Sequence, residues 1–221
     1  TFRFFVPNHE MEMCGHATVG AVWLLQQLGR LPGDQLRIAT LSGVVEARVT
    51  PAGIEISQPK GRLDPLPDGA IAEILAVLGI DEAALAPQAV WNACTSRVKT
   101  LIPLNSVTIL DELKPDFARM EGLCERIGST GLYPFAVSDA HNWTFDARQF
   151  PKSSGYPEDA ATGIAAAALA FGLLESGQVT AAGSTAVMAG KSAMPRKAMG
   201  TSRGAGEVIV SSGVLVAGCP P

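Results

Sequence analysis

Residues Met13-Cys14-Gly15-His16-Ala17-Thr18-Val19-Gly20-Ala21 and Glu158-Asp159-Ala160-Ala161-Thr162-Gly163-Ile164-Ala165 are two versions of one short pattern. Each version is a polar turn that leads into an apolar, alanine-rich stretch, which predicts the start of a helix. Alignment of residue 17 with residue 161 separates the copies by 144 positions, a spacing typical of a duplicated domain rather than of a solenoid repeat. Two helix N-termini that carry reactive side chains predict one small-molecule site between two similar lobes.

The composition indicates a globular protein whose partner is a small molecule. Of the 221 residues, 47% are hydrophobic, which is enough for one large core or two small ones. The formal net charge is −4 and no run of Lys or Arg occurs, so we expect no nucleic-acid and no membrane partner. No apolar stretch reaches the roughly 20 residues that span a bilayer. The four scattered cysteines, Cys14, Cys94, Cys124 and Cys219, are typical of reduced thiols and indicate a cytoplasmic protein.

The hydrophobic pattern predicts an α+β protein with a few helices and many strands. Apolar stretches with helical length and end signals predict helices at residues 17–28, 70–78, 116–127 and 161–176. Short apolar or alternating stretches between turn residues predict strands at residues 1–6, 35–40, 43–50, 53–58, 89–93, 97–103, 107–110, 131–138, 143–150, 185–189, 192–199 and 207–216.

The last predicted helix has no polar face. Residues 164–174 contain no charged side chain, and a helix that is apolar all round is buried. We therefore expect two pseudo-symmetric lobes, each a curved, mostly antiparallel sheet wrapped around a central apolar helix. Residues 1–95 would form the N-terminal lobe, joined by the last strand near residues 207–217, and residues 96–206 would form the C-terminal lobe.

The chain resembles the PhzF family, the phenazine-biosynthesis-like isomerases of the diaminopimelate epimerase fold. The resemblance rests on Phe4-Phe5-Val6-Pro7, on residues 10–20 and on residues 158–163, with a weaker match at residues 189–196. It implies two lobes with the active site in the cleft between them, cofactor-independent chemistry and, in many members, a homodimer. Family members also carry an upstream segment with a glutamate considered the main general acid/base. That segment would precede Thr1.

Asp159 and His16 are the candidate catalytic residues. By the resemblance, Asp159 would bind and orient a substrate amine or hydroxyl, or assist proton transfer. The alternative is that Asp159 only caps the following helix. His16 has a side chain that can bind a substrate carboxylate or shuttle protons near neutral pH, the alternative being a structural histidine. Glu158 is expected to be an exposed carboxylate in the first turn of the helix.

Cys14, Gly15, Thr162 and Gly163 are the candidate substrate-binding residues. The two glycines permit close approach of the backbone, and the free N–H groups of a first helical turn suit a carboxylate or an enolate-like intermediate. Related racemases and epimerases use two facing cysteines as bases. The second copy of the pattern has no cysteine, so we expect Cys14 to be a small buried thiol. No histidine spacing indicates a metal site, and we expect no cofactor.

These observations predict a PhzF-like isomerase that moves a proton on a small, carboxylate-bearing metabolite. Ala160 replaces a proline that is usual in the family, and Ile164 replaces a small polar residue, so the substrate is left open. Two alternatives also stay open. The chain could be a binding protein that has the cleft but lacks the principal acid/base, or the larger piece of an isomerase that an upstream segment completes.

Overall fold

The computed structural model describes residues 1–6, 9–51, 53–57, 61–140, 144–159, 162–179, 185–189, 207–211 and 214–217. Within them the helices are α1 (Gly15–Gln27), α2 (Ala70–Leu78), α3 (Val107–Glu112), α4 (Phe117–Arg126) and α5 (Gly163–Glu175), with a short 3-10 helix at Glu82–Ala84. The strands are β1 (Phe4–Val6), β2 (His9–Met11), β3 (Gln35–Thr40), β4 (Gly43–Thr50), β5 (Gly53–Ser57), β6 (Arg62–Asp64), β7 (Trp91–Cys94), β8 (Val98–Leu104), β9 (Gly131–Asp139), β10 (Thr144–Ala147), β11 (Phe150–Pro151), β12 (Thr185–Ala189), β13 (Glu207–Ser211) and β14 (Val214–Ala217).

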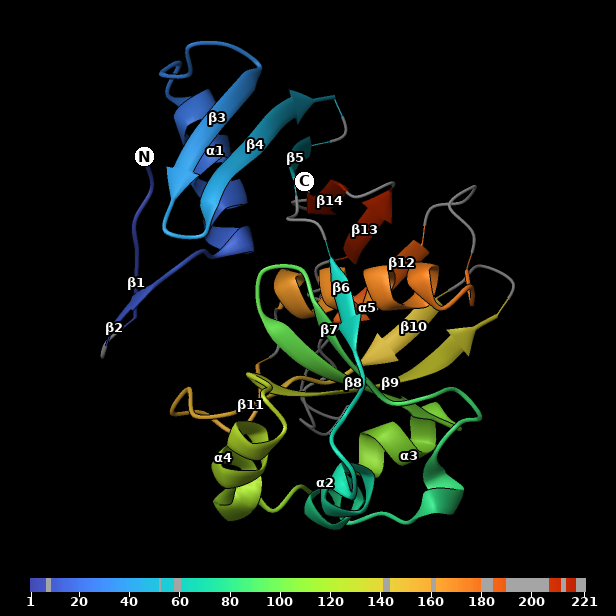
Figure 1. The fold of residues 1–221 in the computed structure, drawn as a ribbon. Coiled ribbons are helices and arrows are strands. Elements are labelled where there is room, and N and C mark those ends of the chain that lie inside the picture. Colours follow the sequence, from blue (N-terminus) through green and yellow to red (C-terminus); the bar gives the residue numbers. More distant parts are fainter. Residues whose placement is uncertain are drawn as a thin grey trace, which may run out of the picture.

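One continuous sheet of the described strands runs through the molecule in the order β3-β4-β5-β14-β13-β12-β10-β9-β8-β7-β6, with β11 added beside β9 (Figure 1). Two neighbouring pairs in this order, β8 with β9 and β10 with β12, are parallel, and the others are antiparallel. The predicted α+β class and the mostly antiparallel sheet are therefore confirmed. The boundary of the two lobes at residue 95 stays a prediction.

Helix α5 is the central buried helix that its sequence predicts. Residues 165–170 are all at most 3% exposed, as is Leu173. The helix packs against strands β6, β7, β8, β12, β13 and β14. Its small side chains let the sheet come close. A Cβ at Gly172 would lie 2.5 Å from Cδ1 of Leu101 on β8, so a larger residue there would have to displace the Leu101 side chain.

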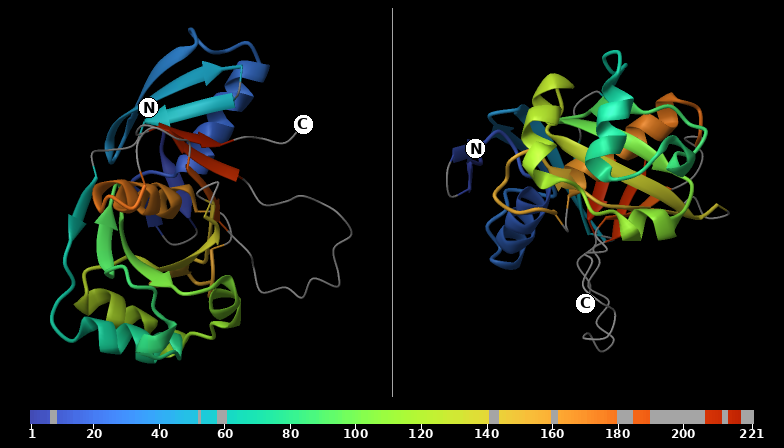
Figure 2. Two further views of the ribbon diagram at one scale, coloured as in Figure 1. Left: turned by 90° about the vertical axis from the view of Figure 1, so that its right-hand side faces the viewer. Right: turned by 90° about the horizontal axis from the view of Figure 1, so that it is seen from below.

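Helix α1 differs from this expectation because only one of its sides is covered. Gly15, Thr18 and Val22 are buried, and the helix packs against β5 and the end of α5 (Figure 2). On the other side Trp23 and Leu24 are 45% and 52% exposed. The two central helices thus share an apolar sequence but not the same enclosure.

A second layer of helices, α2, α3 and α4, covers the face of β8 and β9 that points away from α5 (Figure 1). The predicted helices at 70–78 and 116–127 are confirmed, and the Asp116 side chain caps α4 by accepting from the N–H of Ala118. The predicted strand at 107–110 is wrong. Ser106 accepts a hydrogen bond from the N–H of Ile109, which starts helix α3 directly after β8.

The first and the last described strands of the chain also form strand pairs. Strand β1 pairs with β2, and the N–H of Phe2 donates to the carbonyl of Ala39, so the predicted first strand is confirmed. The predicted single strand at 207–216 is instead the antiparallel pair β13 and β14. Strand β14 also pairs with β5, which makes the sheet continuous. The predicted strand at 192–199 lies outside the described residues.

The helices of the described segments include none with the length and apolar character needed to cross a membrane.

Candidate active site

A cavity of about 480 Å³ lies at the N-terminal ends of α1 and α5. All six residues selected from the sequence line it: Cys14, Gly15, His16, Asp159, Thr162 and Gly163. The residues come from positions almost 150 apart, and the sheet and the contact between α1 and α5 bring them together. Asp159 is near enough to His16 to raise the pKa of the imidazole. The two candidate catalytic side chains therefore share one cavity, while their roles stay predictions.

Asp159 does not cap helix α5, so that alternative interpretation of the residue is wrong. Thr162 is the N-cap, and its hydroxyl accepts from the N–H of Ala165 at 3.4 Å. Asp159 lies three residues earlier, where its backbone N–H donates to the carbonyl of Gln149 at 2.9 Å in an isolated antiparallel bridge. This bridge fixes the backbone of Asp159 against the segment between β10 and β11.

The two copies of the sequence pattern enter their helices at different points. Helix α1 begins at Gly15, with Cys14 as N-cap, whereas α5 begins at Gly163. Thr18, which aligns with Thr162, lies inside α1 and donates its hydroxyl to the carbonyl of Cys14 at 2.8 Å. When the two copies are aligned by the first residue of each helix, Gly15 corresponds to Gly163. The sequence alignment instead pairs Gly15 with Asp159, four positions earlier.

Cys14 and His16 form a contact pair at the start of α1. The Sγ atom of Cys14 lies 3.7 Å from Nε2 and 3.9 Å from Nδ1 of His16. Burial acts to raise the pKa of the Cys14 thiol, but the interactions with His16 and with the N–H of Ala17 outweigh it, and the pKa is lowered. The contact with Cys14 raises the pKa of His16, against burial and with help from Asp159. The thiolate and the imidazolium thus stabilise each other.

We expect iodoacetamide at neutral pH to alkylate Cys14 faster than Cys94 or Cys124, by about tenfold or more. Burial raises the pKa of Cys94, and it raises the pKa of Cys124 to about 11, so both hold less thiolate. Mass spectrometry of tryptic peptides would follow each cysteine separately. In the variant His16→Asn, labelling of Cys14 should slow while Cys94 is unaffected. Equal rates at Cys14 and Cys94 in the unmodified chain would contradict this prediction.

The cavity also contains two cationic side chains that the sequence analysis missed. Arg97 and Lys99 line it from the start of β8, and Lys99 is only 7% exposed. Burial and, to a smaller extent, the charge of Arg97 lower the pKa of Lys99 to about 8, while Asp159 and Cys124 act in the opposite sense. The available signal was a lysine inside the apolar segment Val98–Leu104, where alternation would favour an apolar side chain.

Gln149 is a third residue that the sequence analysis missed. It lines the cavity and is 1% exposed. Among the described residues, neither its amide nitrogen nor its amide oxygen has a hydrogen-bond partner. Nothing in the local sequence marks it, because its isolation depends on residues from other strands.

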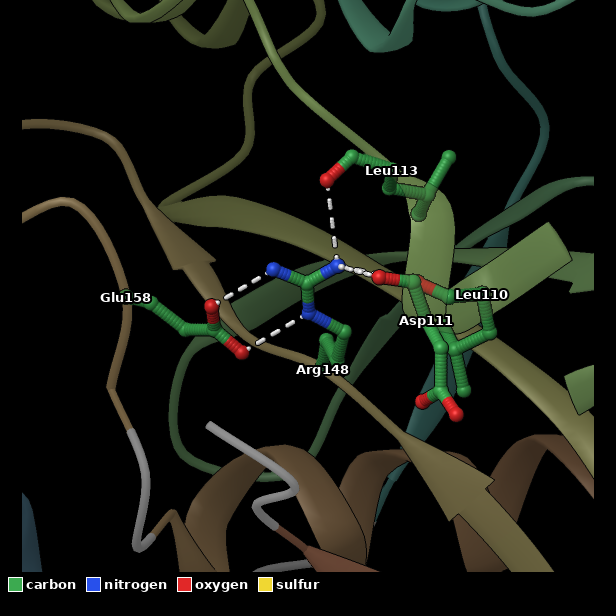
Figure 3. Close-up of polar contacts among 5 residues, drawn as sticks. All are labelled: Leu110, Asp111, Leu113, Arg148 and Glu158. Atoms are coloured by element: carbon green, nitrogen blue, oxygen red, sulfur yellow. Dashed lines mark hydrogen bonds and ion pairs between the residues drawn. The ribbon is translucent and has the colours of Figure 1, made fainter. Parts of the chain in front are cut away.

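Next to Gln149 and Asp159, the side chains of Arg148 and Glu158 form a buried ion pair (Figure 3). Nε and Nη2 of Arg148 donate to Oε1 and Oε2 of Glu158 at 2.9 and 2.8 Å. These side chains are 5% and 15% exposed, respectively. The expectation that Glu158 is an exposed carboxylate is therefore wrong, because an arginine ten residues earlier in the chain covers it.

The same arginine also holds helix α3. Its Nη1 atom donates to the carbonyls of Leu110 and Leu113 at 2.9 and 3.2 Å, at the C-terminal end of α3 (Figure 3). The guanidinium lies 4.9 Å from the ring centre of Phe150. Arg148 thus ties three segments together directly beside the cavity. Glu158 and Arg148 are positioned to hold the neighbouring Asp159 and Gln149 in place.

No group of three or more His, Cys, Asp or Glu side chains that could hold a metal ion occurs within the residues that the structure describes.

Comparison with known proteins agrees with this geometry. The model of the family described as phenazine biosynthesis-like protein, PhzC-PhzF, matches residues 1–216. The chain belongs to the PhzF family.

Curated relatives of this PhzF-family chain are named isomerases. An uncharacterized isomerase of Deinococcus radiodurans is 32% identical over 193 residues, which cover 83% of this chain and 61% of the relative. An uncharacterized isomerase of Escherichia coli K12 is 30% identical over 169 residues, covering 74% and 57%. The chain thus spans about three fifths of the length of these relatives.

Solved structures show the same fold. The PhzF-family phenazine biosynthesis protein of Bacillus anthracis has a TM-score of 0.76 at 20% identity, over 94% of this chain and 70% of that protein. A predicted epimerase of Pseudomonas aeruginosa has a TM-score of 0.71 at 21% identity, over 96% and 73%. A hydroxyproline epimerase of Agrobacterium vitis, solved with bound trans-4-hydroxy-L-proline, has a TM-score of 0.51 at 12% identity, over 96% and 68%. The PhzF chain therefore has the epimerase-like fold that the resemblance implies.

Proposed function

We propose that this chain catalyses a cofactor-independent proton transfer on a small, carboxylate-bearing metabolite in the cavity between α1 and α5. The observation that carries the proposal is the convergence of Asp159 and His16 on one cavity at two helix N-termini. Membership of a family whose curated relatives are named isomerases supports the reaction class.

In the proposed reaction a base removes a proton from a carbon next to an electron-withdrawing group. The electron pair of the broken C–H bond moves into that group and gives an enolate-like intermediate, and a proton then returns to the same or another carbon. Asp159 takes or orients the proton, and His16, whose pKa is raised, is suited to return it as an imidazolium.

The first turns of α1 and α5 stabilise the negative charge of the proposed intermediate. Gly15 and Gly163 present backbone N–H groups of first helical turns to the cavity, where the positive ends of both helix dipoles favour negative charge. Cys14 and Thr162 border the same space as N-caps of the two helices. We further propose a cytoplasmic homodimer. A further acid/base glutamate from an upstream segment, as the resemblance implies, belongs to the same proposal.

Solvent-hydrogen exchange tests the reaction class. The chain is incubated in D₂O with trans-4-hydroxy-L-proline, L-glutamate or cyclohex-2-ene-1-carboxylate, and proton NMR follows the signal of the hydrogen next to the carboxylate. The first acid is the ligand of the hydroxyproline epimerase with this fold. We expect loss of that signal for at least one acid, at a rate proportional to protein concentration. Saturable binding of the acids without exchange, both by this chain and by this chain extended with a PhzF-family upstream segment that carries the glutamate, would instead identify a binding protein and contradict the proposal.

A further inference from the structure

We propose that Lys99 and Gln149 form a subsite that binds a carboxylate of the substrate away from the carbon that exchanges its proton, so that the two helix N-termini stay available for the charge that develops at that carbon. This inference rests on the function proposed above and extends it, because it assigns an acidic group of the substrate to residues outside the two sequence motifs.

Lys99 is a buried cation that forms no ion pair with any residue that the structure describes. It lies on the face of β8 that also carries Leu101, which packs against α5, and it is 7% exposed. A lysine is almost never this buried unless it is paired. Within the described residues, Asp159 and the buried thiol of Cys124 raise the pKa of Lys99 through electrostatic interactions. A charged group in this position would be stabilised by an anion bound in the cavity that it lines.

Gln149 supplies the second, independent observation. Its side chain is buried and lines the cavity, yet both of its amide atoms lack a hydrogen-bond partner in the described part of the chain. Buried amides almost always have partners, so an orphaned amide facing a cavity indicates a missing ligand. Gly131 leaves space for this amide, because a Cβ at that position would lie 2.3 Å from Nε2 of Gln149.

The charged side chains that line the cavity favour the binding of an anion. Arg97 and Lys99 bring two positive charges, Asp159 brings one negative charge, and Cys14 with His16 is neutral as a pair whether or not the proton has moved. The helix dipoles add to the positive potential. A carboxylate has two oxygen atoms, which one ammonium group and one amide N–H can satisfy together.

Benzoate and benzamide provide a matched pair of probes that differ in charge but hardly in shape. Their binding to the full chain is measured by NMR titration up to millimolar concentration. The variants Lys99→Met and Gln149→Leu each remove one polar group with little change in volume. Lys114→Met is the control, since it removes the charge of an exposed lysine that does not line the cavity.

We expect saturable binding of benzoate that is at least about tenfold tighter than that of benzamide. Lys99→Met should weaken benzoate binding by roughly tenfold or more, Gln149→Leu by a smaller factor, and Lys114→Met should leave it unchanged. Thermal unfolding of the two cavity variants should be no lower than that of the unmodified chain, because each exchanges an unpartnered buried polar group for an apolar one. A merely structural role would lower it.

Equal binding of benzoate and benzamide would overturn the inference, as would unchanged benzoate binding in both cavity variants or tighter binding of inorganic phosphate. If Lys99→Met does not fold, Gln149→Leu alone decides between these outcomes. The test is separate from the test of the reaction. Loss of exchange in Asp159→Asn with benzoate binding retained would support both proposals. Benzoate binding that depends on Lys99, without exchange of any acid, would support the subsite and contradict the proposed reaction.

Discussion

Solvent-hydrogen exchange should fall by roughly 10²- to 10⁴-fold in the variant Asp159→Asn, the size of the effect of a positioned general acid or base. An asparagine keeps the shape of the side chain but cannot accept the proton. The backbone of Asp159 is held by the hydrogen bond from its N–H to Gln149, which the substitution does not touch, so we expect the fold to persist. The initial exchange rate by proton NMR, with the acid that exchanges fastest in the unmodified chain, measures this loss.

The same variant has a second readout that does not need a substrate. Asp159 raises the pKa of His16, so its neutralisation should lower the pKa of the imidazole, which an NMR titration of the ring signals follows. Asp68→Asn is the matched control because Asp68 is exposed and lies away from the cavity. Near-normal exchange in Asp159→Asn would remove Asp159 from the mechanism. An unchanged pKa of His16 would contradict the proximity of the two side chains.

Substitution of Arg148 by methionine should lower the free energy of unfolding by about 3–5 kcal/mol. The change leaves the carboxylate of Glu158, which is 15% exposed, without its cation. It also leaves the carbonyls of Leu110 and Leu113 at the end of α3 without their donor. Removal of one partner of a buried pair is costly because the other charge stays buried and unpaired. Urea unfolding followed by circular dichroism measures the difference.

The chain offers a matched control and a matched rescue for this prediction. Arg126 forms an ion pair with Glu73 whose side chains are 59% and 44% exposed, so Arg126→Met should cost no more than about 1 kcal/mol. The double variant Arg148→Met/Glu158→Leu should recover part of the loss, because it removes both charges. If Arg148→Met lowered the free energy of unfolding no more than Arg126→Met, the contacts of Arg148 with Glu158 and with the end of α3 would be unimportant for stability.

Local sequence signals were sufficient for most elements of the fold. The uncharged stretch from Ile164 to Leu174 predicts the buried helix α5, and the alternation at residues 35–58 predicts β3, β4 and β5. Asp116 marks the start of α4 in the sequence and in the structure. These signals are short-range, because the period of the apolar residues and the capping side chain act within a few residues of each other.

The errors have different causes, because some of the competing contacts are local and others come from more distant parts of the chain. Residues 107–110 have the composition of a strand, but Ser106 starts a helix there that packs on β8 and β9. Glu158 looks like a solvent-exposed carboxylate until Arg148 is brought against it. The apolar stretch at residues 207–216 predicts one strand, whereas the structure has the two paired strands β13 and β14 there.

The sequence by itself determined that a helix follows each of the two motifs, that the second helix is buried, and which six motif residues border the cavity, because a motif and its period are properties of neighbouring residues. The residues at which the two helices begin, Gly15 and Gly163, came from the structure. The tertiary structure alone decided that Lys99, Gln149 and the Arg148–Glu158 pair belong beside the six motif residues. Burial and the loss of water depend on strands and helices far apart in the chain, and no local pattern records which of them will meet.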